Sequence, residues 1–278
     1  MSKGISSAAF VLFAAVCIFA GCSIKEDRSQ CPCILELDFS GNGRFDRLDF
    51  GVSSGDDFLY RDMVGNRDFG QPYRLEVPRS GVYLNVYSFA SSDGRADGYG
   101  GGAAVMGETE FIDSDRTSLT IPLGRECPPV YMYSSRIDTG KEMHSEYVLL
   151  RKNYSVLFIR LLSESASPLV LAVGGKIDGY GLDGAPEEGD FYVKPEVNED
   201  GYCEVRIPRQ KDGALRLTIS DEEGVLREFA LGEYIIASGY DWTAADLEDV
   251  EMVIDYAKTG VVFSIKDWEK TVTTVVVI

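Results

Sequence analysis

The chain has 278 residues, of which 45% are hydrophobic, and a formal net charge of −18. So acidic a protein repels the phosphate backbone of nucleic acid and an anionic lipid surface, which excludes both as electrostatic partners. The length is sufficient for two domains of the usual ~100 to 150 residues each, with cores large enough to need no cofactor.

The first 22 residues have the order of an exported leader. Lys3 gives a positive start, residues 8–18 form an apolar run, and the tetrapeptide Phe19-Ala20-Gly21-Cys22 places small residues before a cysteine. The apolar run is shorter than the roughly 20 residues that a membrane-spanning helix needs. The segment is similar to the bacterial lipobox, although Phe19 stands where an aliphatic residue is usual. We therefore predict cleavage after Gly21 and lipidation of Cys22.

Lipidation at Cys22 would anchor the mature chain without a further hydrophobic segment, because two or more acyl chains bind a bilayer stably. Removing residues 1–21 from 278 leaves 257 residues, and the loss of Lys3 brings the formal charge from −18 to −19. Residues 22–30 are polar and lack apolar periodicity, which predicts a flexible tether. No cofactor is expected beyond the covalent lipid.

Four cysteines follow the tether, namely Cys31, Cys33, Cys127 and Cys203. An exported protein can keep disulfides, and a bridge from Cys31 or Cys33 to Cys127 is more plausible than a small strained ring between the first two. Zinc is a competing interpretation, but the spacing of Cys31 and Cys33 is shorter than that of zinc ligands. A buried free thiol is an alternative for Cys203.

The sequence pattern predicts an all-β chain. Leu35, Leu37 and Phe39 alternate with acidic residues, which is the period of a strand with one buried face. Further short runs are separated by Gly, Pro, Ser and Asp clusters and are predicted as strands over residues 73–77, 81–90, 119–123, 130–134 and 147–150. Residues 91–107 are rich in glycine and predict a long loop. The segments up to residue 144 are assigned to a first β-sandwich over residues 31–144, and the run at 147–150 falls after this boundary.

The second half has the same rhythm and is assigned to a second sandwich over residues 145–278. Its predicted strands cover residues 154–162, 169–173, 191–193, 202–207, 215–220, 225–231, 250–254, 261–265 and 271–278. Only residues 232–238 and 244–247 have a helical pattern, and both are short. Spacings of this order predict two tandem antiparallel sandwiches instead of alternating strands and helices.

Motifs for catalysis are weak. Gly51-Val52-Ser53-Ser54-Gly55 fits GxSxG, but a nucleophile elbow needs a following helix and a histidine base, and His144 is the only histidine. A turn between strands is the better interpretation of this motif. The acidic segment 178–190 breaks the ligand order of an EF-hand and is interpreted as a solvated loop. Paired carboxylates for glycoside hydrolysis stay open, since their separation is not a sequence property.

Several landmarks together resemble the FimB-like and Mfa-type fimbrial anchor lipoproteins of type V pili. They are the tether after Cys22, the Cys31-Pro32-Cys33 motif with its alternating strand, and residues 127–134, 149–156, 246–256 and 262–268. The resemblance implies two transthyretin-like sandwich domains and a non-catalytic role. Such anchors hold the base of a fimbrium at the outer membrane and limit its length, with a fimbrial shaft subunit as partner.

Two further assignments follow from this resemblance. Pilins of this kind assemble by strand addition, which makes Thr271-Val272-Thr273-Thr274-Val275-Val276-Val277-Ile278 the candidate contact strand, although an ordinary C-terminal core strand is the simpler interpretation. Lys25-Glu26-Asp27 is similar to the signal that sends lipoproteins to the outer face of the outer membrane. A charged spacer without address value is the alternative.

A surface lipoprotein that binds glycans is the second functional hypothesis. Exposed aromatic side chains would act as stacking platforms, and the candidates are Tyr99, Tyr180, Trp242 and Trp268. The strand context of Trp268 also fits a core residue. The hypothesis requires these rings to cluster on one exposed face.

Overall fold

The computed structural model describes residues 31–55, 57–89, 118–162, 169–181, 183–221, 224–255, 260–267 and 270–277, the last two ranges by their backbone only. Contacts divide the chain into two units, residues 1–32 and residues 33–278. Apart from Cys31 and Pro32, the described residues belong to the second unit. The predicted glycine-rich loop over residues 91–107 lies outside the described residues, as do the leader and residues 22–30 of the tether.

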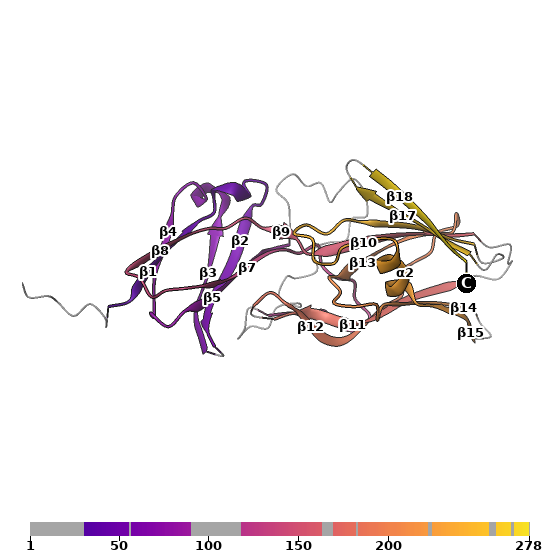
Figure 1. The fold of residues 1–278 in the computed structure, drawn as a ribbon, viewed down its shortest axis with the longest axis horizontal. Coiled ribbons are helices and arrows are strands. Elements are labelled where there is room, and N and C mark those ends of the chain that lie inside the picture. Colours follow the sequence, from indigo (N-terminus) through magenta and orange to yellow (C-terminus); the bar gives the residue numbers. More distant parts are fainter. Residues whose placement is uncertain are drawn as a thin grey trace, which may run out of the picture. The chain divides into compact units, whose positions relative to one another are not determined.

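Two sheets are built mainly from the first half of the chain (Figure 1). The smaller sheet has the order β4 (Tyr73–Val77), β1 (Cys33–Asp38) and β8 (Met143–Tyr147). The larger has the order β3 (Asp57–Gly65), β2 (Arg47–Ser54), β5 (Val82–Ser88), β7 (Tyr131–Ile137) and β9 (Arg151–Lys152). Two short 3-10 helices, η2 (Ser40–Asn42) and η3 (Asn66–Asp68), lie between strands.

Two more sheets are built mainly from the second half. One has the order β13 (Tyr202–Pro208), β10 (Tyr154–Leu162), β16 (Val250–Asp255), β17 (Gly260–Asp267) and β18 (Lys270–Val277). The other has the order β12 (Pro186–Val193), β11 (Val170–Tyr180), β14 (Arg216–Asp221) and β15 (Gly224–Phe229), and β6 (Leu119–Thr120) also pairs with β11. The single α-helix among the described residues is α2 (Leu231–Ala237).

The core is built from strands in which buried and exposed residues alternate. On β1, Leu35 and Leu37 are fully buried while the residues between them face outward. Phe50 of β2 packs against Phe39 with a centroid separation of 5.7 Å and against Tyr73 of β4 at 5.0 Å, which brings the first two sheets face to face. Each large apolar side chain buried in this way contributes about 1.5–3 kcal/mol of transfer free energy.

The all-β sandwich prediction is confirmed, with two corrections to its detail. Two strand pairs, β1 with β8 and β10 with β16, are parallel, so the sheets are mixed and not wholly antiparallel. The predicted helix over residues 232–238 is present as α2, but residues 244–247 form no helix. Arg209 explains this, because its guanidinium takes the carbonyls of Trp242, Ala244 and Ala245 as acceptors.

The division into domains at residues 144 and 145 stays a prediction. Both residues belong to β8, which continues the sheet of β1. β6 lies before the predicted boundary in sequence, but it pairs with β11, which lies after it. The β11–β12 turn also lies against β7, because a Cβ on Gly184 would overlap the side chain of Ser134.

Candidate functional site

The C-terminal strand β18 forms one edge of its sheet. All eight of its residues pair with β17 in an antiparallel hairpin, from Asp267 with Lys270 to Gly260 with Val277. No described strand pairs with its other side, since β18 ends the strand order. A row of backbone N–H and C=O groups on that side is therefore available to an added strand.

The composition of β18 differs from that of the other edge strands. Proteins block exposed edges with charged side chains, proline and bulges. The edge strand β12 has such protection, because it starts at Pro186, carries Glu187, Glu188 and Asp190, and pairs irregularly with β11. The edge strand β3 carries Asp57, Arg61 and Asp62 and contains a bulge. In β18 the only charged residue is Lys270, at its start, and there is no proline.

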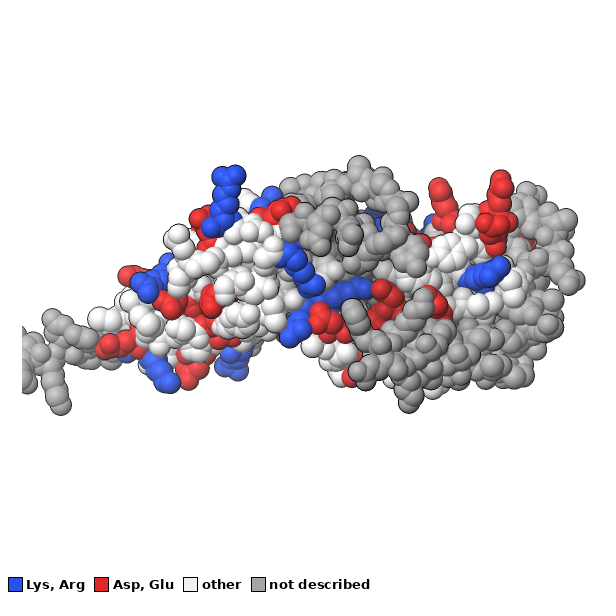
Figure 2. All heavy atoms as spheres, turned by 90° about the horizontal axis from the view of Figure 1, so that it is seen from above, with Lys and Arg blue, Asp and Glu red and all other residues white. Residues whose placement is uncertain are grey.

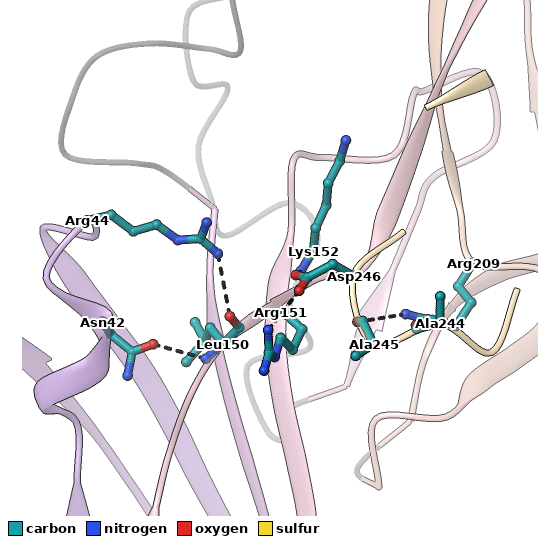
Figure 3. A network of polar contacts seen from close by, with 9 residues as sticks. All are labelled: Asn42, Arg44, Leu150, Arg151, Lys152, Arg209, Ala244, Ala245 and Asp246. Carbon is teal, nitrogen blue, oxygen red and sulfur yellow. Dashed lines mark hydrogen bonds and ion pairs between the residues drawn. The ribbon is translucent and has the colours of Figure 1, made fainter. Parts of the chain in front are cut away.

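Arg209 anchors the loop that leads into the C-terminal strands (Figure 3). Its Nε donates to Asn153 Oδ1, and its Nη1 donates to the carbonyl of Trp242 and, at 2.9 Å, to that of Ala244. Its backbone N–H donates to the hydroxyl of Tyr180, which donates in turn to the carbonyl of Asn153. Burial lowers the pKa of the Arg209 guanidinium. Arg209 thus joins the β9–β10 junction and the loop before β16 through its side chain, and β11 through its backbone N–H.

Two aspartates of the same loop fix the junction between β9 and β10. Asp246 accepts from Arg151 Nη1 at 2.9 Å and from the backbone N–H of Lys152 at 2.7 Å, as Figure 3 shows. Asp249 accepts from Lys152 Nζ and from the backbone N–H of Val156, both at 2.7 Å. The start of β16, and with it the sheet that ends in β18, therefore has a fixed position relative to β10.

The residues assigned to export and lipidation lie outside the described part of the chain. They are Gly21, Cys22, Lys25, Glu26 and Asp27, and their roles stay predictions. In the described part, no helix is long and apolar enough to cross a membrane. The contact strand, residues 271–278, is described through Val277 and forms β18.

The cysteines form no bridge in this structure. Cys31 is exposed, whereas Cys33, Cys127 and Cys203 are buried, and all four are free thiols, which corrects the expectation of a bridge to Cys127. Cys33 and Cys127 have different charged neighbours. Arg79 and Asp138 act electrostatically on Cys33, whereas Arg206 and Glu126 act on Cys127, so the two thiols share none of these neighbours.

The candidate glycan platforms do not form a surface. Tyr180 is fully buried and Trp242 is 6% exposed, with its ring packed 4.5 Å from that of Tyr240. Both are core residues, which corrects their assignment as exposed platforms. Tyr99 and Trp268 lie outside the described residues.

The weak catalytic motifs are not assembled into a site. Ser53 is buried within β2, and the GxSxG segment is strand up to Ser54, which corrects its interpretation as a turn. His144 lies in β8, a strand of the other sheet, and bonds Glu146. Asp178 is in β11 and not in a solvated loop, and burial raises the pKa of its carboxyl. Among the described residues, no group of three His, Cys, Asp or Glu could hold a metal.

Sequence comparison finds no protein-family model that matches the chain and no curated protein that matches it. Solved structures do match its fold. A Bacteroides thetaiotaomicron protein described as polysaccharide-binding aligns with a TM-score of 0.54 and 12% identity over 90% of this chain and 98% of its own. The fimbrial anchor protein Mfa2 from Porphyromonas gingivalis aligns at 0.53 and 11% over 80% and 91%. A Bacteroides thetaiotaomicron adhesin aligns at 0.52 and 14% over 88% and 99%.

These likenesses confirm the predicted resemblance to a fimbrial anchor at the level of the fold. They extend over most of each chain, so the shared feature is the whole arrangement of strands and not one local motif. The sequence could not indicate the role of Arg209, because its partners are backbone carbonyls that no residue pattern marks. The resemblance to fimbrial anchors pointed to residues 271–278 as the contact strand, and their low charge is visible in the sequence, but their place at a sheet edge is not.

Proposed function

We propose that this protein is a non-catalytic lipoprotein of the outer membrane that anchors the base of a fimbrium and limits its length. Acylated Cys22 would hold the chain in the membrane, facing outward, and the fimbrial shaft subunit would be its protein partner. The observation that carries the proposal is the almost uncharged edge of β18, whose outer side pairs with no strand of the described residues. The fold shared with the fimbrial anchor protein Mfa2 supports it.

The mechanism proposed for this contact is strand addition. An extended segment of the neighbouring pilin would hydrogen-bond to the outer edge of β18, and main-chain bonds would provide affinity. The hairpin with β17 holds β18 in an extended conformation before the partner arrives, which lowers the entropic cost of association. The Arg209 and Asp246 contacts keep the first strand of this three-strand unit, β16, in place beside β10.

The surface charge agrees with a docking mode that relies on backbone bonds. On the face shown in Figure 2, acidic and basic side chains of the described residues are interspersed, and no single-sign patch dominates. A partner recognised mainly by charge would need such a patch.

Charged substitutions on β18 test the proposal in cells that carry fimbriae. Thr274→Lys and Val275→Lys alter neighbouring residues and so place charges on opposite faces of β18, and charged side chains are one way in which natural edges avoid pairing. We expect either variant to reach the cell surface in normal amount while fimbriae detach into the medium. Matched substitutions on β12, Tyr192→Lys and Glu188→Lys, should leave fimbriae attached. Firm attachment in both β18 variants would contradict strand addition at this edge.

A further inference from the structure

Apart from the β18 edge, the molecule has an open cavity of about 520 Å³ between α2 and the segment before β14. Asp212, Gly213 and Arg216 form one side, and Glu233, Ile236 and Ala237 of α2 form the other. The cavity is wide open to solvent, so a ligand bound there would stay partly exposed. None of these residues belongs to the β18 edge or to the junction around Arg209.

Two glycines make the walls of this cavity rigid. A Cβ on Gly232 would come within 2.8 Å of the carbonyl carbon of Gly213, so only glycine allows the helix and the loop to approach this closely. The backbone N–H of Gly232 also donates to the carbonyl of Leu215 at 2.9 Å. Glu233, the next residue, is thereby held beside Arg216.

The polar groups of the cavity retain hydrogen-bonding capacity. Arg216 Nη2 lies 3.9 Å from Glu233 Oε1, and Arg216 Nε lies 3.8 Å from Glu228 Oε1, which are ion-pair separations too long for hydrogen bonds. Nη1 is used, because it donates to the carbonyl of Gly213 at 2.9 Å. Nη1 therefore orients the guanidinium. Nε and Nη2 face the carboxylates of Glu228 and Glu233, which can still accept hydrogen bonds.

The remaining surface of the cavity is apolar. Ile236 is 44% exposed, and Ala237 follows it. A ligand that covered Ile236 would remove apolar surface from water, worth roughly 25 cal/mol per Å². The site thus combines an apolar patch with fixed donors and acceptors.

We propose that this cavity binds a neutral sugar unit of a glycan. An anionic ligand would face Asp212 and Glu233, and a cationic ligand would face Arg216. A neutral polyhydroxyl ligand avoids both repulsions, because each of its hydroxyls can donate a hydrogen bond to a carboxylate and accept one from the guanidinium. The C–H face of a pyranose ring matches Ile236 and Ala237. The proposal goes beyond fimbrial anchoring and does not depend on it.

The test uses the full-length protein in a detergent without a sugar headgroup. Probes are an array of oligosaccharides built from neutral glucose, galactose and mannose units, with sialylated oligosaccharides and oligolysine peptides as charged comparators. The strongest neutral probe is then measured by calorimetric titration. We expect Glu233→Gln and Ile236→Asp each to raise the Kd for that probe roughly tenfold or more, because each removes one complementary contact.

Matched substitutions elsewhere separate a binding effect from a folding effect. Glu199→Gln changes an exposed glutamate, and Leu162→Asp changes a side chain that is 41% exposed at the end of β10; neither should alter the Kd. Thermal midpoints of all four variants are measured alongside. Absence of binding to every neutral probe overturns the proposal, as do binding confined to sialylated or oligolysine probes and an unchanged Kd in both cavity variants. Normal fimbrial attachment in the cavity variants keeps this test distinct from that of anchoring.

Discussion

The hydroxyl of Tyr133 donates a hydrogen bond to Glu146 Oε1, and this bond connects β7 to β8, which belong to different sheets. The other carboxylate oxygen, Oε2, lies 2.8 Å from His144 Nε2. A second bond of this kind joins β4 to β3, where the hydroxyl of Tyr73 donates to Asp62 Oδ2. A tyrosine–carboxylate pair therefore ties the two sheets together near both edges.

These pairs predict a dependence of stability on acid. Burial alone would raise the pKa of Glu146, but the bonds from Tyr133 and His144 outweigh it and lower that pKa from 4.5, and the bond from Tyr73 lowers the pKa of Asp62 from 3.8. A depressed pKa contributes stability that is present above the ordinary value and is lost as pH falls through the folded value. We expect the free energy of unfolding to fall below about pH 4.5, measured by urea titration.

The tyrosines supply the control for that measurement. A variant with Tyr73→Phe and Tyr133→Phe should lose about 1 kcal/mol per bond at neutral pH and show a shallower fall in acid, because its carboxylates have lost their donors. Equal pH slopes in both proteins would mean that other groups dominate acid unfolding.

Asn42 of η2 is fully buried and joins that helix to the segment that follows β8. It donates to the carbonyls of Phe39 and Val148 and accepts from the backbone N–H of Leu150 at 2.9 Å. Asn42→Ala leaves these groups unsatisfied, so we expect a loss of about 3 kcal/mol in chemical unfolding. Asn66→Ala, which removes an exposed asparagine with two carbonyl partners, should cost less. Equal losses would contradict the role assigned to burial.

Arg209 should not tolerate lysine. An ammonium cannot reproduce the planar fork that reaches Asn153, Trp242 and Ala244 together. We expect Arg209→Lys to lower stability by about 2–3 kcal/mol and to speed hydrogen exchange in residues 241–249. Arg67→Lys, at an exposed position, is the control and should change neither quantity. Unchanged exchange in Arg209→Lys would show that the loop is held by other contacts.

The cysteines predict a pattern of thiol labelling. Burial raises the pKa of Cys33 and Cys127, and it raises that of Cys203 to about 12, whereas Cys31 is exposed. With a neutral thiol reagent at pH 8, Cys31 should react at once and the buried thiols roughly a thousandfold more slowly, because the thiolate is the nucleophile. In denaturant without reductant, all four should react. Labelling of only two would indicate a disulfide.

Much of the fold was accessible from sequence, since alternation such as that of Leu35 and Leu37 directly marks a buried strand face. Strands β2, β3 and β9 were missed, and the strand expected over residues 147–150 is instead β8 over Met143–Tyr147. The bulge between β2 and β3 breaks the alternation at Phe58 and Tyr60, and the first seven residues of β3 are exposed on both faces. The parallel pairs were also missed, because they depend on contacts far apart in sequence that no local pattern encodes.

Only part of the candidate site could be predicted from the sequence. The low charge of β18 can be read directly, but its place at the edge depends on sheet order. The cavity beside α2 had no sequence signal, because it depends on the close approach of Gly213 and Gly232. Tyr180 and Trp242 show the opposite error, since aromatic residues are as common in cores as on binding faces.

The most direct test of anchoring is to delete the encoding gene in its native host and then image the cells and assay the medium for fimbriae. The proposal predicts shed or abnormally long filaments, which the intact chain corrects and Cys22→Ala does not. Filaments of normal length that stay attached in the deletion strain would contradict it.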